Sequence, residues 1–270
     1  MILSEPNLPA AAPKVSDLAG IMGARILSSG KLHEKYVVRL ADTRLELQAA
    51  QRLRYSVFNV ELHEGLSASE RTRLDADPFD AVCDHLLVLE TATGKVVGTY
   101  RLQTGQVASA HLGYYSAQEF DLTPFESRRE VVIELGRACV DIQHRNLSVL
   151  GLLWKGIAAY AQAKGGRYLI GCSSLTSQDP QVGATVYADL QRRFMVEPAL
   201  RVTPLPKVAC PLDVLLEHPP KLPKLLSAYL SIGAKVCGPP AIDREFKTID
   251  FLTCLDLTVL PPAVAENYLA

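Results

Sequence analysis

The stretch from Glu130 to Lys155 constrains the fold of this chain more than any other. It opens with a nearly continuous apolar run over residues 131–140, which is typical of a β-strand buried on both faces. Two charged residues, Glu134 and Arg137, interrupt that run. A charge buried without a partner is costly, so these side chains either pair with each other or take part in chemistry.

A bulge in this strand would bring both charges to one cleft. Residues three apart on a regular strand point to opposite faces. We predict a β-bulge at Gly136, which would turn Glu134 and Arg137 towards the same cleft and leave backbone N–H groups free there. An ordinary buried ion pair between Glu134 and Arg137 is the alternative that the sequence leaves open.

A helix follows the strand through a basic, polar turn. Arg145 and Asn146 lie in this turn, and apolar residues recur at helical spacing from Leu147 to Ala161. The N–H groups and the dipole at a helix N-terminus favour a bound anion. The sequence therefore predicts an anion site at the start of this helix.

The composition excludes several classes of function. The 270 residues are 48% hydrophobic and carry a net charge of −1, which provides no field for binding nucleic acid. No apolar run is long enough to span a membrane, so we expect a cytoplasmic protein. The six cysteines and six histidines are dispersed without metal-ligand spacing, so neither disulfides nor a metal centre is expected.

The order of the patterns predicts an α/β fold. Residues 1–30 are rich in Ala, Pro and Ser and are expected to form a flexible arm, for which a peripheral contact with the inner face of the membrane stays open. We expect residues 31–270 to form a single domain. A helix begins at the capping box formed by Thr43 and Glu46. The strands and helices that follow indicate one mixed central sheet with helices on both faces, which the C-terminal extension completes.

Further charges lie beside apolar segments. Arg54 and Phe58 lie one turn apart near the end of the first helix and face the same way. A long loop follows and carries Asp77 and Asp80, and loops of that length in a compact domain usually cover or bind something. Arg101 lies within an apolar run at the end of the next hairpin.

Together these segments resemble the GNAT acyltransferases. The motifs of the branch that uses acyl carrier protein recur here in order: LRYxVF at 53–58, DPFDAVCDH at 77–85, RL at 101–102 and ELGR at 134–137. That branch holds the acyl-homoserine-lactone synthases, the long-chain N-acyl amino acid synthases and the ornithine acyl-ACP N-acyltransferases. Segments 79–86, 153–157 and 229–251 are most similar to the last group.

The resemblance implies an enzyme that moves a (3-hydroxy)fatty acyl group from acyl carrier protein to the α-amine of an amino acid, with ornithine the first choice. Glu134, beside Arg137, would take the proton from the amine. The N–H groups of Gly136 and Ala138 would stabilise the oxyanion. The residues implied to bind the amino acid are Arg54, Phe58, Asp77, Asp80, Asp84, His85 and Arg101.

Two roles stay open for the charges around the long loop. The arginines either bind the carboxylate of the amino acid or orient the carboxylates of the loop, because arginine pairs bidentately. Asp77 and Asp80 correspondingly bind the substrate amine or fix the loop. Asp80 with Asp84 and His85 forms a rival acid–base group.

The helix after the bulged strand departs from the GNAT pattern. Acetyl-CoA-using enzymes carry R-x-x-G-x-G or -A there, whereas this chain has RNLSVL at 145–150. Glycine lets backbone approach a pyrophosphate closely, so coenzyme A should bind poorly. The expected donor is acyl-phosphopantetheine on acyl carrier protein, with no tightly bound cofactor. The residues expected to contact this donor are Arg128, Arg129, Arg145, Asn146, Ser148 and Lys155.

Three other functions stay open. An acyl-homoserine-lactone synthase would share these charges, although the long C-terminal extension argues against it. A synthase for glycine, tyrosine or another amino acid would differ only in pocket shape. The non-enzymatic alternative is a silent module that binds acyl carrier protein, against which the retained Glu134 argues.

Overall fold

The computed structural model describes residues 35–218 and 220–268. The arm expected at residues 1–30, and the membrane contact considered for it, lie outside the described residues. In the described part, eight strands form one sheet: β1 (Tyr36–Leu40), β2 (Asp84–Glu90), β3 (Val96–Thr104), β4 (Val132–Val140), β5 (Tyr168–Leu175), β6 (Lys235–Val236), β7 (Ala241–Asp243) and β8 (Thr248–Asp256).

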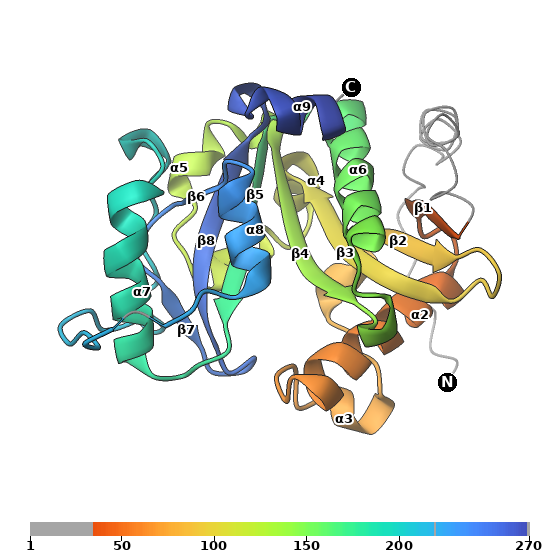
Figure 1. The fold of residues 1–270 in the computed structure, drawn as a ribbon, viewed down its shortest axis with the longest axis horizontal. Coiled ribbons are helices and arrows are strands. Elements are labelled where there is room, and N and C mark those ends of the chain that lie inside the picture. The colour runs from red at the N-terminus through yellow and green to blue at the C-terminus, as the bar shows by residue number, and fades with distance from the viewer. Residues whose placement is uncertain (1–34, 219, 269–270) are drawn as a thin grey trace, which may run out of the picture.

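The sheet is mixed, as predicted. Its order is β1-β2-β3-β4-β5-β8-β6, and β7 also pairs with β8 (Figure 1). Only β4 and β5 are parallel among these pairs of described strands; the others are antiparallel. The C-terminal strands complete the sheet because β8 pairs with the whole length of β5.

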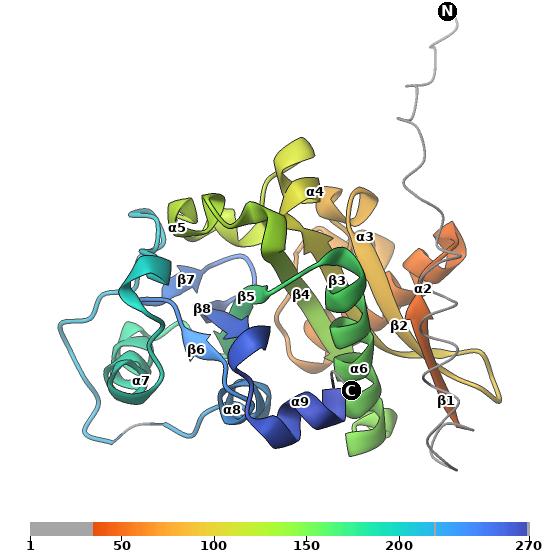
Figure 2. The ribbon, with the colours of Figure 1, turned by 90° about the horizontal axis from the view of Figure 1, so that it is seen from above.

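Helices lie on both faces of the sheet. The α-helices are α2 (Arg44–Tyr55), α3 (Ser69–Thr72), α4 (Gly105–Ala110), α5 (Thr123–Glu126), α6 (Leu147–Lys164), α7 (Pro180–Arg193), α8 (Lys224–Ser231) and α9 (Pro262–Tyr268). We call the side with α6, α8 and α9 the α6 face, and the side with α2, α4 and α5 the α2 face (Figure 2). Within the described residues, no helix has the length and apolar character needed to cross a membrane.

Local sequence explains how two of these helices begin and end. The predicted capping box is present, with Thr43 and Glu46 each bonding the other's backbone at the start of α2. α2 continues directly into a π-helical turn, Ser56–Glu61, which carries Phe58 and Glu61. α6 begins at Asn146, whose Oδ1 accepts hydrogen bonds from the next free N–H groups.

Alternation along the central strands divides the core between the two faces. Leu153 and Ile157 of α6 are fully buried in one cluster with Leu169 of β5. The next residue of β5, Ile170, belongs to the cluster on the opposite face with Phe125 of α5. Successive side chains of a strand therefore reach opposite faces here, as regular geometry requires.

β4 and β5 separate after a short paired segment. Val132–Glu134 pair with Tyr168–Ile170, and the pairing ends there. At that point Gly171 lies against the carbonyl of Leu135, and a Cβ on Gly171 would be 2.3 Å from that oxygen. Only glycine allows the two strands to lie this close where they begin to diverge.

The bulge predicted in β4 is present, one residue further along. Arg101 of β3 pairs with Gly136 and Thr99 pairs with Cys139, so Arg137 and Ala138 together oppose one residue. The residue with left-handed backbone is Arg137, at φ +52°, rather than Gly136. A non-glycine residue in this region is strained by about 1 kcal/mol or more, so its side-chain contacts must hold it there.

Candidate active site

A cavity of about 310 Å³ lies where β4 and β5 separate. On the α6 face its walls are mostly apolar and include Tyr100, Leu135, Trp154, Leu169, Tyr229 and Leu255. On the α2 face they are polar and include Gln103, Tyr115, Ser116, Glu134, Arg137 and Cys172. One cavity therefore offers an apolar half suited to an alkyl chain and a polar half suited to charged groups.

Glu134 lies on the polar side of this cavity and is 4% exposed. Its carboxylate accepts hydrogen bonds from the N–H groups of Tyr115 (2.7 Å) and Ser116 (2.8 Å) and from Gln103 Nε2 (2.5 Å). These contacts fix the carboxylate against the cavity wall. They also hold the 3₁₀ turn Tyr115–Gln118 in place.

Glu134 and Arg137 do not pair with each other, so the alternative of an ordinary buried ion pair between them is wrong. Arg137 turns away through the bulge and forms ion pairs with Asp75 (3.3 Å) and Asp77 (3.0 Å). Its guanidinium also lies 4.8 Å from the ring centre of Tyr115 and 4.2 Å from that of Phe246. These contacts hold the strained backbone of Arg137.

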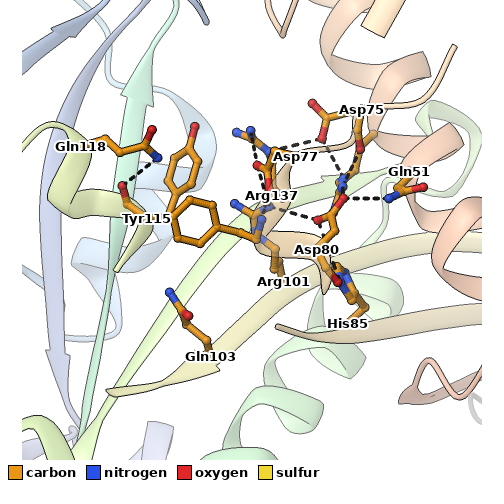
Figure 3. Close-up of polar contacts among 12 residues, drawn as sticks. Gln51, Asp75, Asp77, Asp80, His85, Arg101, Gln103, Tyr115, Gln118 and Arg137 are labelled. Atoms are coloured by element: carbon orange, nitrogen blue, oxygen red, sulfur yellow. Dashed lines mark hydrogen bonds and ion pairs between the residues drawn. The ribbon is translucent and has the colours of Figure 1, made fainter. Parts of the chain in front are cut away.

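Three arginines and three aspartates form a buried network that we call the ion cluster (Figure 3). Arg54 Nε lies 2.9 Å from Asp75 and its Nη2 lies 2.5 Å from Asp80. Arg101 Nη1 contacts Asp77 at 2.7 Å and Asp80 at 3.0 Å. Positive and negative charges are equal in number, so the cluster is neutral as a whole. Its members are Arg54, Asp75, Asp77, Asp80, Arg101 and Arg137.

Burial decides what the ion cluster does. The side chain of Arg54 is 0% exposed and is not a solvated helix charge. Burial alone would raise the pKa of Asp80, but Arg54 and Arg101 overcome this and hold that pKa well below its usual range. The geometry therefore favours the role in which the arginines orient the carboxylates of the loop. Asp77 and Asp80 correspondingly fix the loop against β3 and β4.

The rival acid–base group of Asp80, Asp84 and His85 is only partly brought together: His85 Nε2 lies 4.0 Å from Asp80 Oδ1, but Asp84 lies apart from both. Asp84 and His85 are neighbours on β2 and point to opposite faces. Asp84 accepts a hydrogen bond from Tyr160 of α6 at 2.8 Å, away from the polar half of the cavity. His85 Nε2 lies 3.1 Å from the backbone oxygen of Asp80, and burial lowers the pKa of His85, which keeps it neutral. Neither side chain lines the cavity.

Phe58, predicted to bind the amino acid, lines the cavity. Its ring packs edge-on against Phe246, with 6.0 Å between the ring centres. Phe246 in turn carries the guanidinium of Arg137 on its face. The two rings thus join the π-helical turn after α2 to the C-terminal part of the chain.

The residues predicted to hold the donor separate into two groups. Arg145 precedes α6, donates to the Val140 carbonyl, and forms a bidentate pair with Glu61, whose Oε2 lies 2.7 Å from Nη2. Asn146 caps α6 through the N–H groups of Ser148 and Val149. Lys155 is exposed two turns further along the helix.

Arg128 and Arg129 lie at the other end of β4 from Arg145 and Asn146, and their part in docking the carrier stays a prediction. They precede β4, whereas α6 follows its far end, and nine residues of strand rise about 30 Å. Arg129 contacts Glu126 and the Ser109 hydroxyl instead. These arginines are close to Arg145 in sequence, but the whole of β4 lies between them and Arg145.

Comparison with known proteins identifies the family. A family model described as an acetyltransferase (GNAT) domain matches residues 53–155. The L-ornithine N(alpha)-acyltransferase of Rhizobium meliloti (strain 1021) is 35% identical over 234 residues, which cover 81% of this chain and 79% of that protein. The protein of the same name from Brucella abortus (strain 2308) is 34% identical over 237 residues, covering 82% and 84%. The chain belongs to the L-ornithine N(alpha)-acyltransferase family.

Membership of this family makes the protein an N-acyltransferase, as the sequence motifs imply. Solved structures confirm its GNAT-like fold. FeeM, an N-acyl amino acid synthase from uncultured soil microbes, superposes with a TM-score of 0.51 at 12% identity, covering 83% of this chain and 92% of that chain. The AHL synthase LasI gives 0.50 at 13% identity, covering 86% and 94%.

Sequence reasoning missed several acidic residues in or next to the cavity. Glu64 lines it from the loop after α2, and burial raises its pKa. Glu119 and Asp250 lie behind the polar wall and are 5% and 4% exposed. Asp250 interrupts the apolar run of β8, the same signal that identified Glu134. Glu119 follows a short 3₁₀ turn and lies in no apolar strand run, so no interrupted run marks it in the sequence.

Glu119, Cys172 and Asp250 also come close to one another, with their ligand atoms within 4.8 Å. The dispersed spacing of cysteine and acidic residues did not suggest this grouping. Burial raises the pKa of Cys172 well above its ordinary value, so the thiol stays protonated. A protonated thiol is a poor nucleophile and a poor metal ligand.

Proposed function

We propose that the protein transfers a fatty acyl group from acyl carrier protein to the α-amine of ornithine. The family relationship supports the acceptor, because its curated relatives are named for ornithine. The observation that carries the proposal is the cavity between β4 and β5, with an apolar half on the α6 face and a polar half on the α2 face. An acyl amino acid has the same division.

The apolar half accommodates the acyl chain. Leu135, Leu169 and Leu255 supply aliphatic surface, and Trp154 packs edge-on against Tyr229 at 5.5 Å between ring centres. Each methylene group removed from water in such a pocket contributes about 0.8 kcal/mol. The thioester then lies at the level of the β4 bulge, where the two halves meet.

Glu134 acts as the general base at this junction. An amino acid carries a protonated α-amine near neutral pH, and that amine must lose a proton before it attacks the thioester carbon. Glu134 takes the proton directly or through water. The nitrogen forms the new amide bond, the C–S bond breaks, and the phosphopantetheine thiol leaves with a proton. The three hydrogen bonds to Glu134 fix its orientation.

The bulge supplies the groups that stabilise the oxyanion. Beyond Glu134 the β5 side of β4 has no strand partner. On the β3 side Gly136 pairs with Arg101. The proposed donors to the negative oxygen of the tetrahedral intermediate are the N–H groups at the bulge, those of Gly136 and Ala138. Removing one such donor in other acyl-transfer enzymes costs about 10²–10³-fold in rate.

The start of α6 supports a carrier-bound donor. Its first turn has no glycine, and the Asn146 side chain already occupies the N–H groups of Ser148 and Val149. A pyrophosphate needs several such groups at close range. The single phosphodiester of phosphopantetheine needs fewer N–H groups. Arg145 can exchange its ion pair with Glu61 for a contact with this phosphodiester.

A donor comparison tests this function. The purified protein is given L-ornithine with either acyl carrier protein or coenzyme A as the carrier of the same long acyl chain. We expect thiol release with acyl carrier protein, a product identified by mass spectrometry as Nα-acylornithine, and a much lower kcat/KM with the coenzyme A thioester. Comparable kcat/KM values for the two donors would overturn the carrier assignment. Absence of acylornithine with both donors would overturn the function.

A further inference from the structure

Two buried carboxyl groups lie next to the polar half of the cavity, and we call them the acid pair. Glu119 follows the 3₁₀ turn Tyr115–Gln118, and Asp250 lies on β8 opposite Ser174 of β5. They are 5% and 4% exposed, and their oxygen atoms lie within 4.8 Å of each other. The mechanism proposed above uses neither of them.

The acid pair has no cation. Among the described residues, neither Glu119 nor Asp250 forms an ion pair, because the nearest guanidinium, that of Arg137, is already paired with Asp75 and Asp77. Burial and the facing charge of Asp250 raise the pKa of Glu119 to about 10, and burial raises that of Asp250 to about 6. Two facing carboxyl groups without a counter-charge share a proton for this reason.

Three acceptor atoms here lack a hydrogen bond of standard geometry. They are Glu119 Oε2, Asp250 Oδ1 and the hydroxyl oxygen of Thr248. Thr248 is 2% exposed, lines the cavity itself, and lies two residues before Asp250 on the same face of β8. Weaker side-chain hydrogen bonds link Asp250 to Ser174, Thr248 and Glu119, so the pair has neutral donors nearby, but none of these groups brings a positive charge.

A row of contacts joins the acid pair to the base. Ser116 donates its N–H to Glu134 at 2.8 Å, and its hydroxyl lies 3.5 Å from Cys172 Sγ. Cys172 Sγ lies 3.9 Å from Glu119 Oε1. Glu134, Ser116 and Cys172 all line the cavity. Glu119 and Asp250 do not line the cavity themselves; this row and Thr248 connect them to its polar wall.

We propose that Glu119 and Asp250 form the receptor for the side-chain ammonium group of the acceptor amino acid. The inference rests on the proposed function and adds the residues that select a basic acceptor. An ammonium group offers three N–H donors and a positive charge, which match three acceptors and a carboxyl pair in need of a cation. A divalent metal ion is a poorer fit, because the neighbouring Cys172 thiol stays protonated.

The test compares two acceptors in neutralised variants. L-norvaline has the carbon skeleton of ornithine without the terminal ammonium. We expect the wild-type protein to prefer ornithine strongly over norvaline. Glu119→Gln and Asp250→Asn should each lower kcat/KM for ornithine about 10- to 100-fold, the worth of a charged hydrogen bond, while kcat/KM for norvaline stays the same or rises. Asp189→Asn, on the exposed side of α7, is the matched control and should change neither.

The outcomes separate this inference from the function on which it rests. If the wild-type protein acylates ornithine and norvaline equally well, the receptor is disproved while the acyltransferase stands. Equal losses with both acceptors in a variant that melts normally also overturn the receptor. Loss of activity on metal chelation, with metal content missing from Glu119→Gln, would assign the pair to a metal ion instead. If no acceptor is acylated by the wild-type protein, the function itself fails.

Discussion

The ion cluster and the acid pair are both groups of buried carboxylates on the α2 face, and they differ in charge balance. In the ion cluster three aspartates meet three arginines, every carboxylate has a cation, and the sum is zero. In the acid pair, Glu119 and Asp250 face each other with no cation among the described residues. The charges of the ion cluster are neutralised by its own residues, whereas those of the acid pair are not.

The difference indicates which charges hold the fold and which await a ligand. A buried ion pair that is satisfied internally has little left to offer a substrate, and breaking it destabilises the protein. A buried carboxyl pair without a cation is unfavourable to folding and favourable to binding one. Glu134 lies between the two groups. Within the described part of the chain it has hydrogen bonds but no cation.

The largest effect is expected from replacing Glu134. This substitution tests whether Glu134 acts as the general base. Glu134→Gln should lower kcat about 10²–10⁴-fold, the usual contribution of a general base. The amide also turns an N–H donor towards the backbone N–H of Tyr115 or Ser116, so melting must be measured on the same protein. Steady-state thiol release with ornithine gives kcat.

Gln103→Met is the matched control for Glu134. It removes one of the three hydrogen bonds to the carboxylate and keeps the base. We expect a loss of kcat well below that of Glu134→Gln. Equal losses in the two variants would assign Glu134 to positioning the Tyr115–Gln118 turn rather than to proton transfer.

The next effect concerns stability and the ion cluster. Arg54→Met keeps side-chain bulk but leaves Asp75 and Asp80 short of a counter-charge, so the free energy of unfolding should fall by about 3–5 kcal/mol. Urea denaturation measures this change. Arg52→Ala, two residues earlier and exposed on the same helix, should change it by less than about 0.5 kcal/mol. If both variants are equally stable, the cluster does not hold the loop.

The smallest effect is a pH dependence that belongs to the acid pair alone. The raised pKa of Asp250, about 6, means that this carboxyl takes up a proton as the pH falls through that value, and protons then compete with the ammonium of the acceptor. The ratio of kcat/KM for ornithine to that for norvaline should fall about tenfold per pH unit below pH 6. In the Asp250→Asn variant this ratio should no longer change with pH.

The ratio cancels other titrations, because both acceptors share the α-amine and the donor. The sign would be reversed if the acid pair bound its ligand in the protonated form. A ratio that rises as the pH falls, or stays constant in the wild-type protein, therefore contradicts the receptor. The titratable or charged groups that act on the acid pair from neighbouring elements are Cys172 of β5, Asp243 of β7 and Arg137 of β4.

Much of the fold follows from local sequence. The apolar run at 131–140 becomes β4, the Thr43–Glu46 capping box starts α2, and the strand expected at 168–175 has those bounds. These features depend on residues within one or two turns of each other, and short-range preferences decide them. The motifs around Arg54, Asp77 and Glu134 likewise identify the family without any coordinates.

The pairing of charges was decided by tertiary structure. Sequence placed Glu134 and Arg137 together as possible partners, but the bulge sends Arg137 to a loop about 60 residues earlier in the chain, at Asp77. The length of β4 likewise separates Arg128 from Arg145, which the sequence grouped on one docking face. Proximity in sequence says little about direction once a strand or a bulge intervenes.

The acid pair shows this limit most clearly. Asp250 could be suspected from its apolar surroundings, as Glu134 was, but Glu119 lies 131 residues before it in sequence and outside any regular strand. The sequence by itself determined the fold class, the family and the buried strand that carries Glu134. Only the tertiary structure places the two carboxyls together: the pairing of β8 with β5 positions Asp250, and the hydrogen bonds from the Tyr115–Gln118 turn to Glu134 position Glu119. Side chains of distant segments meet through such contacts and not through sequence spacing.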